Sequence, residues 1–94
     1  MDSDASKTMR WVIHGRVQGV FFRQSTKQQA DALGLTGWVK NLPDGCVACS
    51  ASGPESLLEE FEVWLHQGPP EARVTEIDAR QAEFEPGTRF DVLR

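Results

Sequence analysis

The chain has 94 residues, of which 39% are hydrophobic and 26% are charged, and its formal net charge is −4. This length suits one compact domain, and the lack of an apolar run of about 18 residues excludes a membrane-spanning helix. The acidic balance argues against general binding to nucleic acids or anionic membranes, because both require a basic surface. Any anion site in this chain must therefore be local.

The N-terminal stretch MDSDASKT is polar and lacks the basic and apolar regions of a secretory signal. We therefore expect residues 1–7 to form a disordered leader and residues 8–94 to form the single domain. A cytoplasmic location and a monomeric state are the corresponding expectations for a small acidic chain.

The first half of the chain predicts a strand, a helix and a hairpin. Apolar and polar residues alternate in MRWVIHGRV, which predicts a half-buried strand over residues 8–16. Apolar residues then recur at helical spacing until Gly34, which predicts a helix over residues 22–34. The runs LTGWVKN and CVACSAS are separated by LPDG, whose proline and glycine are typical of a turn, so these runs should form a hairpin.

The second half predicts a helix and two further strands. GPESLLEEFEVWLHQGPP carries an apolar stripe at helical spacing, opens on a proline suited to a first turn and closes on Gly68 with two prolines. These signals predict a helix over residues 54–67. A strand is expected within residues 72–84, and RFDVLR, residues 89–94, should add a short terminal strand.

The element order is therefore β-α-β-β-α-β with a terminal strand, which is the order of two split βαβ units. We predict an α+β ferredoxin-like sandwich, in which two helices pack on one face of an antiparallel sheet. Many unrelated functions use this architecture, so the fold alone does not assign one.

Cys46 and Cys49 form a C-x-x-C motif, a spacing that is compatible with a redox pair or with half of a metal site. A redox pair normally opens a helix, whereas the next predicted helix begins several residues later. Side chains three apart in a strand point to opposite faces, so these thiols should fill space in a sheet. His14 and His66 lack the spacing of zinc ligands, and His14 precedes the glycine-containing loop, which disfavours a phosphohistidine role. We expect no metal and no cofactor.

The segment GRVQGV, residues 15–20, joins the first predicted strand to the first helix. Its backbone N–H groups could converge ahead of the helix, as in loops that bind phosphate. Gly19 would allow a close approach of the backbone, and Arg23 could span two phosphate oxygens. A tight turn beside a solvated arginine is the alternative, and these residues alone leave both interpretations open. Asn41, taken alone, is a turn residue at the end of a strand.

Taken together, two segments resemble both signature segments of the acylphosphatase family. GRVQGVFFR agrees with the first signature at Gly15, Val17, Gln18, Gly19, Val20, Phe22 and Arg23. GWVKNLPDGCV and a later glycine agree with the second at Gly37, Trp38, Val39, Lys40, Asn41, Gly45, Val47 and Gly53. The resemblance extends from the first strand to RFDVLR. One departure, Ala48 where family members often carry an acidic residue, lies outside the catalytic set.

This resemblance implies the ferredoxin-like fold and the hydrolysis of acyl phosphates to a carboxylate and inorganic phosphate. It also implies phosphate binding by Arg16, Val17, Gln18, Gly19, Val20 and Arg23. Asn41 would hold the attacking water, so Arg23 and Asn41 are the expected catalytic residues. A carboxylate leaves without a strong general acid, and we therefore expect a metal-independent reaction that depends on positioning and charge. Inorganic phosphate, the product, should also inhibit.

A non-enzymatic phosphate-binding regulatory module is the alternative function, although such a module has no use for an amide that holds water. An RNA-binding module of the same fold would need exposed aromatic residues on the central strands and basic flanks. The acidic balance and the lack of an RGFGFV-like strand argue against that second alternative. Nothing in the sequence indicates which acyl group the substrate carries.

Overall fold

The computed structural model describes residues 5–94. Its elements, in chain order, are β1 (Ser6–Arg16), α1 (Phe22–Leu33), β2 (Thr36–Asn41), β3 (Val47–Pro54), α2 (Glu55–Gln67), β4 (Arg73–Ala82) and β5 (Phe90–Val92). The predicted element order and the ferredoxin-like α+β class are confirmed. Neither helix of this described part has the length and apolar character needed to cross a membrane.

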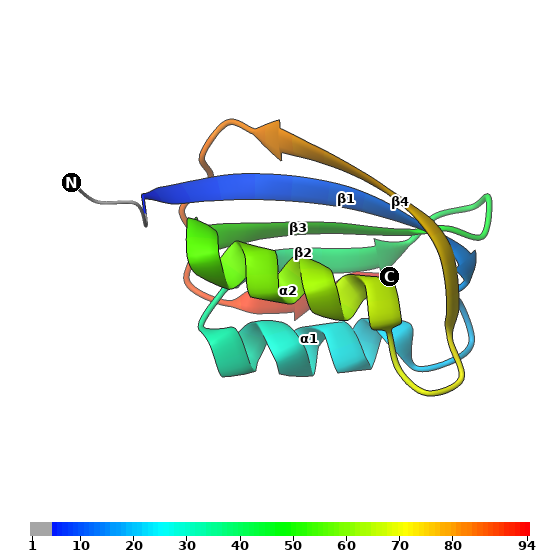
Figure 1. Cartoon of the computed structure of the whole chain (residues 1–94). Coiled ribbons are helices and arrows are strands. Elements are labelled where there is room, and N and C mark those ends of the chain that lie inside the picture. Colours follow the sequence, from blue (N-terminus) through cyan, green and yellow to red (C-terminus); the bar gives the residue numbers. More distant parts are fainter. Residues whose placement is uncertain (1–4) are drawn as a thin grey trace.

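The strands form one sheet in the order β4-β1-β3-β2-β5, and Figure 1 shows both helices on the same face of it. The pairs of β1 with β3, of β1 with β4 and of β2 with β3 are antiparallel, as predicted. The terminal strand β5 instead runs parallel to β2, with Trp38 opposite Asp91. This parallel pair, which the sequence pattern did not specify, brings the end of the chain beside the end of β2.

The element boundaries differ slightly from the predicted ones. Strand β1 begins at Ser6, because Ser6 and Lys7 continue the ladder opposite Pro54 and Gly53 of β3. The ladder thus takes in the last residues of the predicted leader, while residues 1–4 lie outside the described part of the chain. Helix α1 ends at Leu33, because the next residue, a glycine, adopts a left-handed conformation with φ 71°.

The core lies between the sheet and the two helices. The fully buried large side chains include Trp11, Ile13, Phe22, Leu58, Phe61, Leu65 and Phe90. The rings of Trp11 and Phe61 meet edge to face with their centroids 5.5 Å apart, and Phe61 meets Phe90 at 6.1 Å. Strand β5 is therefore fixed by core packing as well as by its pairing with β2.

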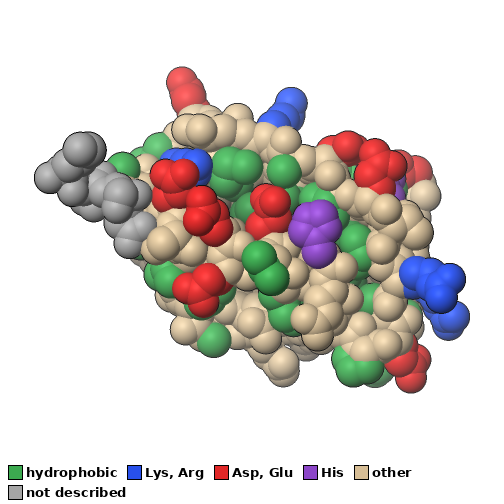
Figure 2. Space-filling model, in the orientation of Figure 1, with side chains coloured by type: hydrophobic (Ala, Val, Ile, Leu, Met, Phe, Trp, Pro, Cys, Tyr) green, Lys and Arg blue, Asp and Glu red, His purple; other side chains and the backbone are tan. Residues whose placement is uncertain are grey.

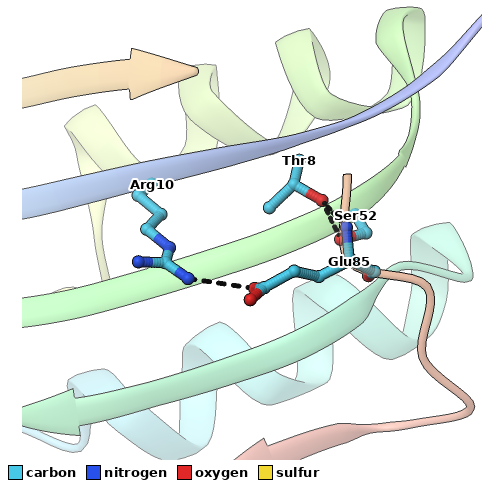
Figure 3. A network of polar contacts seen from close by, with 4 residues as sticks. All are labelled: Thr8, Arg10, Ser52 and Glu85. Carbon is cyan, nitrogen blue, oxygen red and sulfur yellow. Dashed lines mark hydrogen bonds and ion pairs between the residues drawn. The ribbon is translucent and has the colours of Figure 1, made fainter. Parts of the chain in front are cut away.

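The segment between β4 and β5 crosses one end of the other sheet face, where it is tied to β1 and β3 (Figure 3). The backbone N–H of Glu85 donates to Thr8 Oγ1 at 2.8 Å, and Ser52 Oγ donates to Glu85 O at 2.8 Å. Thr8 Oγ1 and Ser52 Oγ lie 2.5 Å apart. Because the Ser52 proton is used on Glu85, the Thr8 hydroxyl must donate to Ser52. Arg10 and Glu85 also form an exposed ion pair at 3.0 Å, which contributes little to stability.

The two cysteines are free, and the expectation that they do not converge is confirmed. Cys49 lies opposite Trp11 in the ladder and is fully buried in the core. Cys46 precedes β3, and its Sγ lies 3.2 Å from His14 Nδ1, while His14 Nε2 lies 3.0 Å from Asp78 Oδ2. Burial, helped by a hydrogen bond with the Asp44 carboxylate, raises the pKa of the Cys46 thiol.

Candidate active site

A cleft of about 790 Å³ lies where the loop after β1, the start of α1 and the ends of β2 and β5 meet. Its lining residues are Val17, Gly19, Phe21, Phe22, Arg23, Gln24, Asn41, Val92 and Arg94. In Figure 1 the loop between β1 and α1 and the turn between β2 and β3 lie at the same end of the molecule. The fold therefore gathers three distant parts of the chain around one opening.

The loop of residues 17–21 has a conformation that leaves its amide groups available. Among the described residues, none accepts a hydrogen bond from the backbone N–H groups of residues 17–20. Gly19 has φ 74°, and a Cβ built on it would meet no atom within 4 Å, so the space beside this backbone is open. Gly15 has another role, because a Cβ there would lie 2.0 Å from Arg73 O of β4. Its absence of a side chain serves strand packing.

Arg23 lies in the first turn of α1 and borders the cleft. Its Nη1 donates to Leu93 O at 2.9 Å, and Leu93 N in turn donates to Val39 O at 2.8 Å. The residue after β5 thus fixes one nitrogen of the guanidinium. Because a guanidinium has five N–H donors in a planar fork, the others are left for an anion in the cleft.

Asn41 is the last residue of β2 and borders the same cleft. Its Oδ1 is buried and has no hydrogen-bond partner within residues 5–94. A buried carbonyl oxygen without a partner costs about 1–3 kcal/mol, so native proteins rarely keep one. A water molecule at the edge of the cleft would satisfy this acceptor.

Gln18 connects the loop to the hairpin that follows Asn41. Its Nε2 donates to Leu42 O and to Cys46 O, both at 2.8 Å. The two carbonyls flank the turn, in which Cys46 N also donates to Asp44 Oδ1 at 3.0 Å. This last hydrogen bond stabilises the carboxylate and lowers the pKa of Asp44. The Gln18 side chain therefore points toward the turn.

The charge of the cleft is positive although the chain as a whole is acidic. Arg23 and Arg94 line the cleft, and none of the other lining residues is acidic. In Figure 2, several acidic side chains lie on the face that carries helix α2, while a group of Lys and Arg side chains projects at the end where β1 finishes. This local field favours an anionic ligand.

The structure brings together four of the residues expected at the site, since Val17, Gly19, Arg23 and Asn41 all border the cleft. The other three predicted residues do not line it: Arg16 is exposed at the end of β1, Gln18 turns toward the hairpin and Val20 is buried in the core. Their backbone groups still belong to the loop.

The sequence analysis did not assign five of the lining residues to the site: Phe21, Phe22, Gln24, Val92 and Arg94. Phe21 stood at a variable position of the first signature and gave no signal. Val92 and Arg94 reach the cleft through the parallel pairing of β5 with β2, which no periodicity in RFDVLR could have indicated.

The described part of the chain contains no group of three or more His, Cys, Asp or Glu side chains arranged to hold a metal ion. His14 and Cys46 touch each other, but on the sheet face away from the helices, because His14 alternates with the core residues Trp11 and Ile13.

Comparisons with known proteins agree with this geometry. A family model described as acylphosphatase matches residues 9–92. The acylphosphatase of Methylococcus capsulatus is 46% identical over 94% of this chain and 97% of its own length. The structure of an acylphosphatase from Coxiella burnetii superposes with a TM-score of 0.92 at 36% identity, covering 99% of this chain and 100% of that one. The acylphosphatase from Bacillus subtilis gives a TM-score of 0.91 at 37% identity, covering 96% of this chain and 100% of that one.

Proposed function

The chain belongs to the acylphosphatase family and hydrolyses acyl phosphates, and we propose that it does so by attack of water on a phosphoryl group held between the loop of residues 16–20 and Arg23. The water oxygen forms a bond to phosphorus while the bond from phosphorus to the bridging oxygen breaks. The carboxylate leaves with that electron pair, and the proton of the water passes to the phosphate product or to solvent.

Few catalytic groups suffice for this reaction, because a carboxylate leaves unprotonated and needs no general acid. A loose transition state also needs no strong general base. The main tasks of the protein are therefore to position the reactants and to stabilise the charge on the equatorial oxygens. The free amides of residues 17–20 and the guanidinium of Arg23 supply hydrogen bonds and charge. Arg94 adds a second cation at the same cleft.

The unpartnered Oδ1 of Asn41 is the observation that carries the proposal. An amide oxygen accepts a hydrogen bond from water and does not titrate, so it orients the nucleophile at any physiological pH. Asn41 borders the same cleft as Arg23. A water molecule bound to Asn41 can therefore attack a phosphoryl group bound to Arg23. A regulatory module that only senses anions would need no such group, and it would show no turnover.

Replacement of Arg23 tests the anion site. We expect Arg23→Ala to lower kcat/KM for acetyl phosphate by about 10²- to 10³-fold, the usual effect of losing one preorganised oxyanion donor. Competitive inhibition by inorganic phosphate should weaken as well. Arg80→Ala, which removes an exposed arginine of β4, is the matched control and should change neither value. Unchanged phosphate inhibition in Arg23→Ala would contradict the assignment.

Replacement of Asn41 tests the water site and should give a different result. We expect Asn41→Ala to lower kcat by about 10²-fold or more while inhibition by inorganic phosphate persists, because the lost group holds water and not the anion. The inhibition constant for phosphate, measured on the same variant, serves as the control for the change in kcat. An equal loss of turnover and of phosphate affinity would show that Asn41 binds the anion.

We further propose that inorganic phosphate is a product inhibitor and that the protein acts as a cytoplasmic monomer. Its small size and acidic balance support the monomeric state and the location, and the anion-binding groups proposed above support product inhibition. Light scattering after size-exclusion chromatography measures the mass in solution, and fractionation of cells that express the chain locates it.

A further inference from the structure

Phe21 occupies a position that is unfavourable for phenylalanine. Its backbone is left-handed, with φ 63° and ψ 25°, and no other non-glycine residue among residues 5–94 has a positive φ. This conformation is strained for a residue with a Cβ and a large side chain. Backbone strain of this kind concentrates at functional sites.

The same residue also forms the N-cap of α1, where serine, threonine, aspartate or asparagine would bond to the first turn. No side-chain cap hydrogen bond is present there. The ring is 80% exposed, although the next residue, Phe22, is buried in the core. Strain, a missing cap and an exposed ring therefore coincide at one position, and packing explains none of them.

The ring borders the candidate active site. Phe21 lies between Gly19 of the loop and Arg23 of α1, and all three line the cleft. Val17 and Val92 add apolar surface to the same lining. The cleft therefore has an apolar part next to the groups that would hold the phosphoryl group, and an acyl phosphate has the matching shape, with its apolar substituent joined to the phosphate through a carbonyl.

We propose that Phe21 forms one wall of an acyl-group subsite and that the protein prefers acyl phosphates with aromatic or other bulky apolar acyl groups. This inference rests on the proposed function, because it takes the phosphoryl group to lie beside Arg23. A planar ring on the acyl carbon presents a face to the ring of Phe21, whereas an acetyl group offers a single methyl. The exposed ring of Phe21 stays out of the core, and the residue lines the cleft.

The test compares benzoyl phosphate with acetyl phosphate. We expect the ratio of their kcat/KM values to fall by about five- to tenfold in Phe21→Ala, the size of a lost aromatic contact. Phe84→Ala is the matched control, because Phe84 is also exposed, at 52%, and is absent from the cleft lining. The control should keep the ratio of the unmodified protein.

Phe21→Gly separates the ring from the backbone strain. Glycine adopts a positive φ freely, so this variant should resist urea at least as well as the unmodified protein and yet show the same lowered ratio. A ratio that falls in Phe21→Ala and is restored in Phe21→Gly would assign the effect to loop geometry and overturn the subsite. An unchanged ratio in both variants would also overturn it.

Competition by two phosphonates gives a readout that does not depend on turnover. Phenethylphosphonate has about the length of benzoyl phosphate, and ethylphosphonate lacks the ring. We expect phenethylphosphonate to bind about five- to tenfold more tightly to the unmodified protein, and Phe21→Ala to remove this preference. If neither acyl phosphate is hydrolysed while the phosphonate preference is present, the proposed function fails and the subsite stands. If both are hydrolysed without any phosphonate preference, the subsite fails alone.

Discussion

The side chain of Gln18 joins the two segments that carry the proposed catalytic groups. It extends from the loop between β1 and α1. It donates two hydrogen bonds of 2.8 Å to the carbonyls of Leu42 and Cys46, on either side of the turn that follows Asn41. A change in the position of the loop is therefore transmitted to the turn. Since catalysis by positioning is sensitive to shifts of about 1 Å, Gln18 has the place of a positioning residue.

We predict that Gln18→Ala lowers kcat about tenfold and the free energy of unfolding by about 1–2 kcal/mol, because two carbonyls lose their donor and the two segments move independently. Steady-state kinetics and urea unfolding measure the two effects. Gln28→Ala, at an exposed position of α1, should change neither. If Gln18 were merely structural, the variant would lose stability while its folded fraction kept the original kcat.

At this scale the sequence predicted the groups that a motif fixes and missed those that tertiary pairing brings in. Arg23 and Asn41 were predicted from the two signatures, and both line the cleft. Phe21 and Arg94 were missed, since an exposed aromatic residue and a terminal arginine have no periodicity or spacing of their own. Gln18 was predicted to bind phosphate as part of the loop, but the role of its side chain was not predicted, because its hydrogen bonds depend on a turn far along the chain.

Local sequence patterns predict the helices and strands of this chain, but they predict only part of the strand pairing. The alternation in β1 placed Trp11 and Ile13 in the core, and the glycine after Leu33 ended α1 as predicted. Strand β5 was predicted, yet its parallel pairing with β2 was not, because the direction of a three-residue strand depends on where the preceding segment crosses the sheet. That crossing is fixed by the ring of hydrogen bonds among Thr8, Ser52 and Glu85.

We predict that Thr8→Val lowers the free energy of unfolding by about 1–3 kcal/mol, because it leaves the buried Thr8 site without the hydroxyl that accepts from Glu85 and donates to Ser52. Valine keeps the shape of the side chain, so the change reports the hydrogen bonds. The value of kcat/KM should stay the same, since Thr8 lies near the start of β1 and the active-site loop follows its end. Urea unfolding monitored by tryptophan fluorescence measures the stability.

The control for this variant is Thr88→Val, at an exposed position of the same connection between β4 and β5. A surface substitution of this kind should stay within about 0.5 kcal/mol of the unmodified protein. Equal stability of the two variants would mean that the crossing segment is held by the packing around Phe90 instead of by the hydroxyl ring.

At the scale of the whole molecule, the buried thiol of Cys49 can be used to measure unfolding of the domain. Cys49 is fully buried in the core, in the central strand β3. Complete burial strongly raises the pKa of this thiol. The raised pKa and the packing both suppress the thiolate, which is the reactive form. Reaction of Cys49 with a disulfide reagent therefore requires that the core open.

We predict that a Cys46→Ala variant, with Cys49 as its remaining thiol, reacts with Ellman's reagent at pH 8 only through global unfolding. A domain with about 5 kcal/mol of stability or more would slow labelling by more than about 10³-fold relative to the chain in urea. The logarithm of the labelling rate should rise with urea at the slope of the equilibrium unfolding curve, because both report the same exposed surface. A fast rate that does not depend on urea would instead mean that β3 opens locally, and the central strand would then not belong to the most stable unit of the fold. The Cys49→Ala variant, which reports Cys46 beside the β2–β3 turn, should label faster, since a turn opens without the core.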